Sequence, residues 1–234
     1  LAKPAEQTPL IAAQGIAILL EAGVPPGVVQ LLPGQGETVG AQLTGDDRVR
    51  GVMFTGSTEV ATLLQRNIAS RLDAQGRPIP LIAETGGMNA MIVDSSALTE
   101  QVVVDVLASA FDSAGQRCSA LRVLCLQDEI ADHTLKMLRG AMAECRMGNP
   151  GRLTTDIGPV IDSEAKANIE RHIQTMRSKG RPVFQAVREN SEDAREWQSG
   201  TFVAPTLIEL DDFAELQKEV FGPVLHVVRY NRNQ

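Results

Sequence analysis

The chain has 234 residues, 43% of them hydrophobic and 22% charged, a balance that favours a folded globular protein over a disordered one. Its formal net charge is −7 without a cluster of Lys and Arg, which argues against a nucleic-acid-binding surface. The longest apolar run, 15–20, is too short to span a membrane. The three cysteines show neither CxxC nor zinc-ligand spacing, so we expect a reducing compartment, no disulfide framework and no metal site.

Helix and strand signals alternate along the first third of the chain. Thr8 and Pro9 predict the start of a helix with its body at 10–22, and Gly23 follows its end. Further helices are expected at 38–43 and 58–70, and strands at 28–32, 49–54 and 79–84. This β–α–β–α–β order is typical of a parallel sheet with helices on its faces.

The remainder of the chain continues the α/β pattern after the glycines at 86 and 87. Helices are expected at 98–111, 130–146 and 164–178, and strands at 90–93, 121–126, 183–187, 202–210 and 224–230. The polar stretch 188–200 predicts an exposed loop. The chain begins at Leu1 without a Met or a signal-peptide pattern and ends soon after an apolar run, so we expect a piece of a longer protein.

Two glycine-containing turns can hold a phosphate or another ligand. Gly56 and Ser57 follow the strand 49–54 and open the next helix, where backbone N–H groups and the positive dipole end suit an anion. Gly36 and Gly40 accompany another helix start. The alternative at both places is an ordinary turn, with Ser57 as a helix cap, because neither matches GxGxxG or a Walker loop.

Three further places carry reactive or binding side chains. Glu84 ends a strand beside glycines and can act as a general base, or it is simply an exposed carboxylate. Cys118 follows a helix end in a glycine-containing turn and can act as a nucleophile if a base activates it, or it is an unreactive thiol. The histidines are scattered, so Glu84 is the base we expect for Cys118. Glu219 and Phe221 lie in a Gly-Pro turn and can clamp a sugar and a ring.

Taken in order, five segments resemble the aldehyde dehydrogenase superfamily, and the resemblance extends over the whole chain. The segments are 3–8, 54–58, 84–87, 115–118 and 219–223. The stretches 83–91 and 116–122 are similar to the pyrroline-5-carboxylate (glutamate γ-semialdehyde) dehydrogenase part of bacterial bifunctional proline utilization A proteins. The chain has Met88 where most superfamily members have Lys.

The resemblance implies an α/β fold with three layers: helices, a sheet, and helices again (αβα). It implies that residues 1–85 are part of a Rossmann-like, parallel-sheet NAD-binding domain and that 86–234 are part of a second, catalytic α/β domain that bears the cysteine. It also implies a small aldehyde substrate, a homo-oligomeric parent and a cytoplasmic location, with peripheral membrane association open to the parent protein. Nothing in this segment indicates contact with nucleic acid or membrane.

The same resemblance assigns cofactor-binding roles position by position. Lys3 and Glu6 correspond to the pair that holds the adenosine ribose hydroxyls, and a carboxylate at Glu6 would repel a 2′-phosphate, so NAD is expected over NADP. Gly36 and Gly40 lie where the adenine end passes close to the backbone. The remaining cofactor contacts are Gly56 and Ser57 at the pyrophosphate, Glu219 at the nicotinamide ribose and Phe221 near the nicotinamide ring.

For the chemistry, the resemblance makes Cys118 the nucleophile, Glu84 the general base and Ser119 a contact of the substrate carboxylate. The Cys118 thiolate attacks the aldehyde to give a thiohemiacetal, whose oxyanion needs fixed N–H donors, the Cys118 backbone N–H among them. Hydride transfer to the nicotinamide leaves a thioester, and Glu84 deprotonates the water that hydrolyses it. The predicted function is NAD-dependent oxidation of L-glutamate γ-semialdehyde, from pyrroline-5-carboxylate, to L-glutamate in proline catabolism.

Parts of the family's site lie outside this chain. The Asn side chain that completes the oxyanion hole precedes it, and the substrate-anchoring loop and oligomerisation strand follow it. Because removing one oxyanion donor costs about 10²–10³ in rate, we expect the isolated chain to be inactive. The alternatives are another NAD-dependent semialdehyde dehydrogenase, or a catalytically silent structural or interaction module, against which the intact Cys118 and Glu84 argue.

Overall fold

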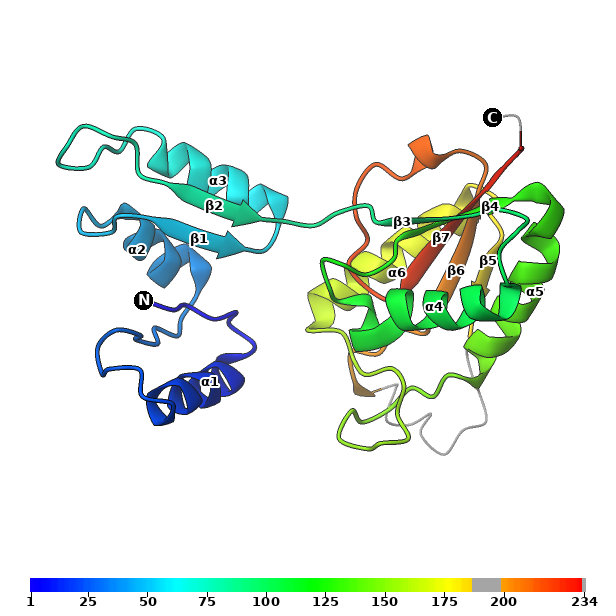
Figure 1. Cartoon of the computed structure of the whole chain (residues 1–234), viewed down its shortest axis with the longest axis horizontal. Helices are drawn as coiled ribbons and strands as arrows, with labels where there is room; N and C mark the ends of the chain where they lie inside the picture. Colours follow the sequence, from blue (N-terminus) through cyan, green and yellow to red (C-terminus); the bar gives the residue numbers. More distant parts are fainter. Residues whose placement is uncertain (187–198, 233–234) are drawn as a thin grey trace. The chain divides into compact units, whose positions relative to one another are not determined.

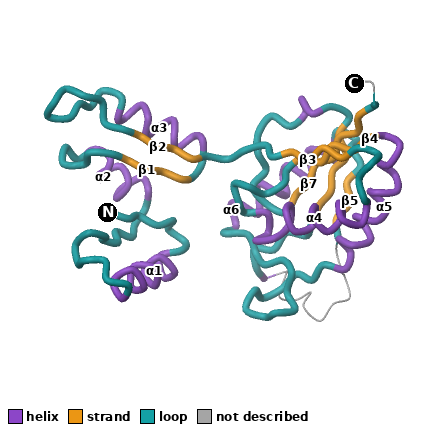
Figure 2. The backbone as a smooth tube through the Cα atoms, viewed as in Figure 1, coloured by secondary structure: helices purple, strands orange, loops and turns teal. Residues whose placement is uncertain are grey.

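The computed structural model describes residues 1–186 and 199–232, and the chain divides into two compact units (Figure 1). Unit 1 is Leu1–Gly86 and unit 2 is Gly87–Gln234. Each unit is an arrangement of helices and mainly parallel strands (Figure 2), which confirms the α/β prediction. No helix in the described part of the chain is both long and apolar enough to cross a membrane.

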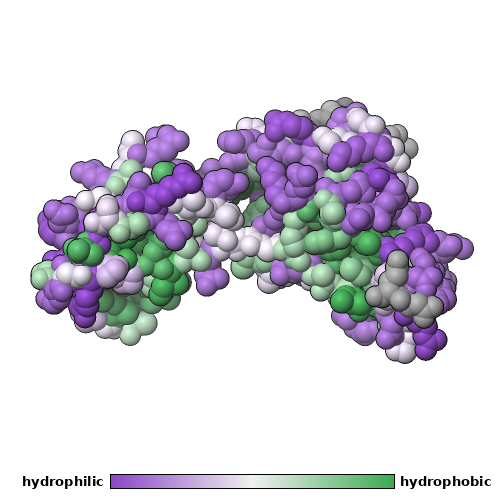
Figure 3. Space-filling view, turned by 90° about the horizontal axis from the view of Figure 1, so that it is seen from above, coloured by the Kyte–Doolittle hydropathy of each residue, from purple (hydrophilic) through white to green (hydrophobic). Residues whose placement is uncertain are grey.

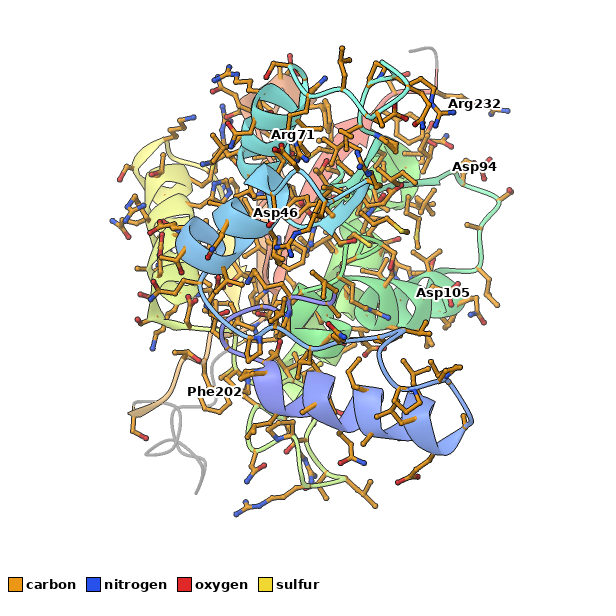
Figure 4. The ribbon with its side chains drawn as sticks, turned by 90° about the vertical axis from the view of Figure 1, so that its left-hand side faces the viewer. Asp46, Arg71, Asp94, Asp105, Phe202 and Arg232 are labelled. Carbon is orange, nitrogen blue, oxygen red and sulfur yellow. The ribbon has the colours of Figure 1, made fainter. Side chains whose placement is uncertain are left out.

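Unit 1 contains a two-stranded parallel sheet and three helices. Its elements are α1 (Pro9–Glu21), the π-helical turn η1 (Gly36–Gly40), α2 (Ala41–Gly45), β1 (Val52–Thr55), α3 (Thr58–Ile68) and β2 (Leu81–Glu84). The register runs from Val52 opposite Leu81 to Thr55 opposite Glu84, with α3 as the crossover helix. Arg71 pins the segment after α2, because it donates to the carbonyl oxygens of Thr44, Asp46 and Val49; Asp46 and Arg71 are labelled in Figure 4.

The first helix begins and ends where its sequence predicts. Pro9 occupies the first turn of α1, where its missing N–H costs nothing. Gly23 adopts a positive φ of 94° and donates its N–H to the Leu20 carbonyl, which closes the helix. The helix buries none of its residues, and Leu10 is 85% exposed. Figure 3 shows that unit 1 also carries hydrophobic surface on the face seen from above.

The strand expected at 28–32 is wrong. Two isolated bridges form instead, Pro26 with Val29 and Ala2 with Leu31. At the second, the Ala2 N–H donates to the Gln30 carbonyl and the Leu32 N–H donates to the Ala2 carbonyl. Pro4 and Pro33 follow closely on the two segments, and a proline has no N–H to extend the ladder. The helix expected at 38–43 is also displaced, because η1 starts it earlier and α2 continues it to Gly45.

Unit 2 is a five-stranded sheet with helices on both faces. Its elements are β3 (Ala90–Val93), α4 (Thr99–Phe111), the 3₁₀ turn η2 (Asp112–Gly115), β4 (Val123–Gln127), α5 (Asp128–Glu144), α6 (Ser163–Ser178), β5 (Val183–Gln185), β6 (Thr206–Leu210), η3 (Phe213–Glu215) and β7 (Val224–Tyr230). The strand order is β3-β4-β7-β6-β5, and only β5 runs antiparallel to its neighbour.

The core of unit 2 lies between its sheet and the covering helices. Helices α4 and α5 pack together on one face of the sheet and α6 lies on the other (Figures 1 and 4). Val106 of α4, Leu124 of β4, Leu138 of α5 and Leu225 of β7 are fully buried. Each such side chain contributes about 1.5–3 kcal/mol through burial, so this sheet is a firm base for the loops at its edges.

Most element boundaries in unit 2 follow the sequence pattern. The strands expected at 90–93 and 224–230 are confirmed as β3 and β7. The strand expected from 121 starts at Val123, and the one expected from 202 starts at Thr206 because 202–205 form no ladder. Most of the loop expected at 188–200 lies outside the described residues.

Candidate active site

Cys118 lies exposed in a tight turn between α4 and β4, here called the Cys118 turn (residues 112–121). Three consecutive residues, Ser113, Ala114 and Gly115, have left-handed backbone with φ of 57°, 54° and 66°. For Ser and Ala this conformation costs about 1–2 kcal/mol each, so surrounding contacts must hold it. The turn therefore depends on tertiary partners.

One such partner is Asn89, which immediately precedes β3. Its Nδ2 donates to the carbonyl oxygens of Cys118 (2.7 Å) and Ala120 (2.9 Å). Its own carbonyl accepts the N–H groups of Arg122 (3.0 Å) and Val123 (3.1 Å). Asn89 thus fixes the chain on the carboxyl side of Cys118. The sequence motif included Asn89 without giving it a role, and only its place in a matching segment marked it.

A second partner is Arg122, which is 1% exposed. Its guanidinium donates to the Gly115 carbonyl (2.7 Å) and the Arg117 carbonyl (3.1 Å) of the Cys118 turn. It also donates to the Gly222 carbonyl (3.2 Å) and pairs with the Glu219 carboxylate. Burial lowers the pKa of Arg122, against which Glu219 acts, and an arginine keeps its charge through such a shift. Sequence reasoning missed Arg122, although a lone Arg in an apolar run is a visible signal.

Glu219 and Phe221 lie beside the Cys118 turn, because Arg122 contacts both of them as well as the turn. The Glu219 Oε1 atom accepts a hydrogen bond from Arg122 Nε (3.0 Å) and forms an ion pair with Arg122 Nη2 (2.9 Å). The Arg122 Cζ lies 5.1 Å from the centre of the Phe221 ring, a cation–π distance, and Phe221 is 46% exposed. Ser119 is exposed next to Cys118. Cys118, Ser119, Glu219 and Phe221 therefore occupy one region of unit 2.

In unit 1, Lys3, Glu6, Gly36 and Gly40 also lie together. Lys3 Nζ is 3.2 Å from Glu6 Oε1 and donates to the Gly34 carbonyl (2.9 Å), while the Gly36 N–H donates to the same Glu6 oxygen (2.6 Å). A Cβ on Gly40 would lie 3.7 Å from the Lys3 side chain. Hydrogen bonds from the Glu6 and Gly36 backbone N–H groups lower the pKa of Glu6, so this carboxylate is charged at neutral pH.

Gly56, Ser57 and Glu84 meet at the carboxyl ends of β1 and β2. The Gly56 N–H donates to the Glu84 carbonyl (3.1 Å), and Glu84 itself is exposed. Ser57 Oγ accepts from the Val60 N–H (3.2 Å), so Ser57 caps α3, as the structural alternative predicts. Ligands of open parallel sheets bind at the carboxyl ends of the strands, which is where these residues lie.

The predicted residues therefore form two groups in unit 1 and one in unit 2. Glu84 belongs to unit 1 and Cys118 to unit 2. Among the residues that the structure describes, no cluster of three or more His, Cys, Asp and Glu is placed to hold a metal ion.

Comparison with known proteins gives a consistent family. The chain matches the aldehyde dehydrogenase family over residues 1–234. The bifunctional protein PutA of Salmonella typhimurium is 93% identical over 234 residues, which are 100% of this chain and 18% of that protein. A 1-pyrroline-5-carboxylate dehydrogenase of Bacillus cereus is 34% identical over 227 residues, 96% of this chain and 43% of that protein.

Solved structures agree. A mutant of proline utilization A from Bradyrhizobium japonicum has 47% identity and a TM-score of 0.89, covering 100% of this chain and 23% of that one. A betaine aldehyde dehydrogenase mutant from Staphylococcus aureus, in complex with NAD⁺, has 30% identity and a TM-score of 0.88, covering 99% of this chain and 46% of that one. The chain spans less than half the length of each of these relatives. It belongs to the aldehyde dehydrogenase family.

Proposed function

We propose that this chain is the central part of an NAD-dependent dehydrogenase that oxidises L-glutamate γ-semialdehyde, formed from pyrroline-5-carboxylate, to L-glutamate in proline catabolism. The relatives named for proline utilization and for pyrroline-5-carboxylate dehydrogenase support the substrate. The observation that carries the chemistry is Cys118, an exposed thiol in a strained turn that Arg122 fastens to Glu219. A reducing cytoplasm suits a reactive thiol of this kind.

The first group in unit 1 fits the adenosine end of NAD. The Glu6 carboxylate is charged and held by the Gly36 N–H and by Lys3, so it can accept hydrogen bonds from the 2′ and 3′ hydroxyls of a ribose. The same charge repels the 2′-phosphate of NADP. We therefore assign Lys3, Glu6, Gly36 and Gly40 to the adenosine, and Gly56 and Ser57, at the α3 N-terminus, to the pyrophosphate.

In unit 2, Glu219 is assigned to the nicotinamide ribose and Phe221 to the ring beside it. Because the hydrogen bond and the ion-pair contact from Arg122 both end on Oε1 of Glu219, the other carboxylate oxygen is the one assigned to a ribose hydroxyl. Phe221 offers a half-exposed aromatic face on which a flat ring can pack. NAD, when bound, supplies the acceptor for the hydride that leaves the substrate carbon.

Cys118 carries the covalent chemistry. Its thiolate attacks the aldehyde carbon to form a thiohemiacetal, and its own backbone N–H is a donor to the oxyanion. Loss of hydride from that carbon leaves a thioester on Cys118. Glu84 then takes a proton from the water that hydrolyses the thioester to the carboxylate. Ser119, exposed beside Cys118, is assigned to the carboxylate of the substrate.

We expect activity to require more of the enzyme than these 234 residues, so the test uses a longer host protein. This host, called the PutA host below, is the bifunctional protein PutA of Salmonella typhimurium in which this chain replaces the matching 234 residues. We expect NADH formation from pyrroline-5-carboxylate, abolished by Cys118→Ser and unaffected by Cys125→Ser. In Glu84→Gln, one equivalent of NADH should form rapidly and turnover should then stop, because the thioester persists.

Two other readings make different predictions. Another semialdehyde dehydrogenase would show a higher kcat/KM for a different semialdehyde in the PutA host. A silent module would keep the fold while Cys118 reacted with iodoacetamide no faster than Cys125 and Cys145 and without response to NAD. For the isolated chain we expect no measurable turnover, and robust NADH production by it would overturn that expectation.

A further inference from the structure

A single buried guanidinium joins two segments that lie far apart in the sequence. Arg122 is 97 positions from Glu219 and 100 from Gly222, yet it contacts both residues. On its other side it contacts Gly115 and Arg117 in the Cys118 turn. Burying a guanidinium is costly unless its donors are paired, and one carboxylate would be enough to neutralise the charge. The three carbonyl contacts therefore exceed what charge neutralisation needs.

The two segments also touch directly. A Cβ on Gly115 would lie 2.2 Å from the Gly222 carbonyl oxygen, so the two backbones approach as closely as glycine allows. The Glu219 segment (residues 219–223) thus packs on the Cys118 turn without a side chain between them. Arg122 reaches both at this point of contact and adds the ring of Phe221 to the set.

Arg122 is itself held rigidly by the sheet. Its N–H donates to Asn89 before β3, and its carbonyl accepts the His226 N–H of β7 at 2.9 Å. His226 Nδ1 lies 3.3 Å from the same carbonyl, and its Nε2 lies 2.8 Å from Nε2 of His172 on α6. The Arg122 backbone is therefore fixed to the segment before β3 and to β7, and His226 connects it to α6. A guanidinium carried by a fixed backbone can set the positions of the groups it binds, in addition to neutralising a charge.

We propose that Arg122 is a positioning residue that holds the Cys118 turn and the Glu219 segment in one register. This inference rests on the proposed function for its consequence: Glu219, assigned to the nicotinamide ribose, and Cys118, assigned to the nucleophile, keep a fixed spacing because one guanidinium binds both segments. Arginine is required because its planar fork supplies five donors, whereas the ammonium of lysine is a compact point charge with three donors.

The first test needs no cofactor and uses this chain itself. Backbone hydrogen exchange is followed by mass spectrometry in Arg122→Lys, which keeps the charge opposite Glu219 and loses the fork. We expect exchange to rise at least about tenfold in peptides from both 112–121 and 219–224, because charge-assisted bonds to several carbonyls are lost together. The matched control is Arg181→Lys, whose arginine pairs with Asp211 and Glu215 and should affect only peptides near 211–215.

A second variant separates the two halves of the link. Glu219→Gln removes the charge of the pair and leaves the guanidinium bonds to the Gly115, Arg117 and Gly222 carbonyls in place. Exchange should therefore rise in 219–224, where the Glu219 contact is weakened, and stay unchanged in 112–121. If Arg122→Lys does not fold, Glu219→Gln alone tests the proposal. A rise of exchange in both peptides would then contradict it, because the charge pair, and not the several donors of the guanidinium, would be what holds the two segments together. Unchanged exchange in Arg122→Lys, or an equal rise throughout unit 2, would overturn the proposal.

The second test asks for the consequence in the PutA host. We expect Arg122→Lys to raise KM for NAD and to lower kcat, each about tenfold or more. The reason is that Glu219, assigned to the ribose, and Cys118, the nucleophile, are no longer held by the same side chain. Glu219→Gln should act mainly on KM, and Arg181→Lys on neither. Normal values of both constants in Arg122→Lys would contradict the proposal. A host that makes no NADH from pyrroline-5-carboxylate would refute the proposed function, while the exchange pattern would still decide the role of Arg122.

Discussion

Gly115 lies so close to Gly222 that a Cβ at position 115 would be 2.2 Å from the Gly222 carbonyl oxygen and 2.9 Å from the Ala110 carbonyl oxygen. Both neighbours are backbone atoms, which cannot rotate away. Gly115 also has a φ of +66°, which L side chains rarely adopt. Steric space and backbone conformation thus exclude every other residue at this position, three residues before the candidate nucleophile.

Gly115→Ala should therefore lower the free energy of unfolding of unit 2 by about 2 kcal/mol or more, through strain at a special φ and overpacking. The control is Gly140→Ala in α5, where an added Cβ meets nothing within 4 Å and helix propensity improves by about 1 kcal/mol. Urea unfolding followed by circular dichroism measures both changes. A Gly115→Ala variant as stable as the original chain would show that the turn can open without loss.

Asn89→Ala should release the chain around Cys118, because the Asn89 amide donates to the carbonyls of Cys118 and Ala120. Leaving the partly buried Ala120 carbonyl and the exposed Cys118 carbonyl without this donor should cost about 1 kcal/mol. Asn89→Asp should cost more, since a carboxylate would face two carbonyl oxygens. The control is Asn168→Ala, which removes only an exposed contact to Arg171. Equal unfolding midpoints for the variants at 89 and 168 would refute the role given to Asn89.

The contact between buried His226 and partly buried His172 predicts acid sensitivity. Burial, and then the nearby His172, lowers the pKa of His226 to about 3, from an ordinary value of 6.5, and burial lowers the pKa of His172 as well. Below pH 6.5 the unfolded chain takes up protons on these rings more readily than the folded chain does, above all on His226. Stability should therefore fall as pH drops from about 6.5 towards 3, by up to about 1.4 kcal/mol per pH unit for His226.

Two variants test this histidine effect. His226→Gln should shrink the difference in unfolding free energy between pH 7.5 and pH 5, because one of the two rings that stay neutral in the fold is gone. His133→Gln, in an exposed position on α5, should leave that difference as it is. A pH dependence that His226→Gln and His133→Gln alter alike would rule out the buried pair as its source.

Cofactor selectivity should change at Glu6. In the PutA host, Glu6→Gln removes the charge that pairs with Lys3 and repels a 2′-phosphate, so the ratio of kcat/KM for NADP to that for NAD should rise about tenfold or more. Glu37→Gln, on the neighbouring η1 turn, is the matched control and should leave the ratio unchanged. If both variants behave alike, Glu6 is not at the adenosine ribose.

Local signals in the sequence predicted most elements of the fold. Pro9 and Gly23 mark the ends of α1, and Ser57 marks the start of α3, because proline, glycine and capping residues act within one or two turns of the chain. The strand expected at 28–32 failed because a strand needs a partner, and the segment around Ala2 contributes a single bridge. Pairing of this kind depends on residues distant in the sequence, which periodicity does not report.

The residues of the candidate site also fall into those identified from the sequence and those identified only from the structure. Motif resemblance supplied Cys118, Glu219 and Phe221, and the structure brings them into one region of unit 2. Its matching stretches included Arg122 and Asn89 but gave neither a role, because their partners lie many positions away: Asn89 is 29 positions from Cys118. Residues that organise a site by binding carbonyl oxygens leave little trace in a motif, because they recognise backbone atoms that every residue has.

The exposed apolar side chains of unit 1 have a consequence for how the chain melts. Among its residues only Ala61, Ile68 and Ile79 are buried hydrophobics, while Met53 on β1 is 84% exposed. Unit 2 holds nearly all of the buried apolar surface, and stability follows that surface. Heating should therefore produce two transitions instead of one, with unit 1 melting first. The adenosine-binding candidates would then be lost while the sheet around Cys118 was still folded.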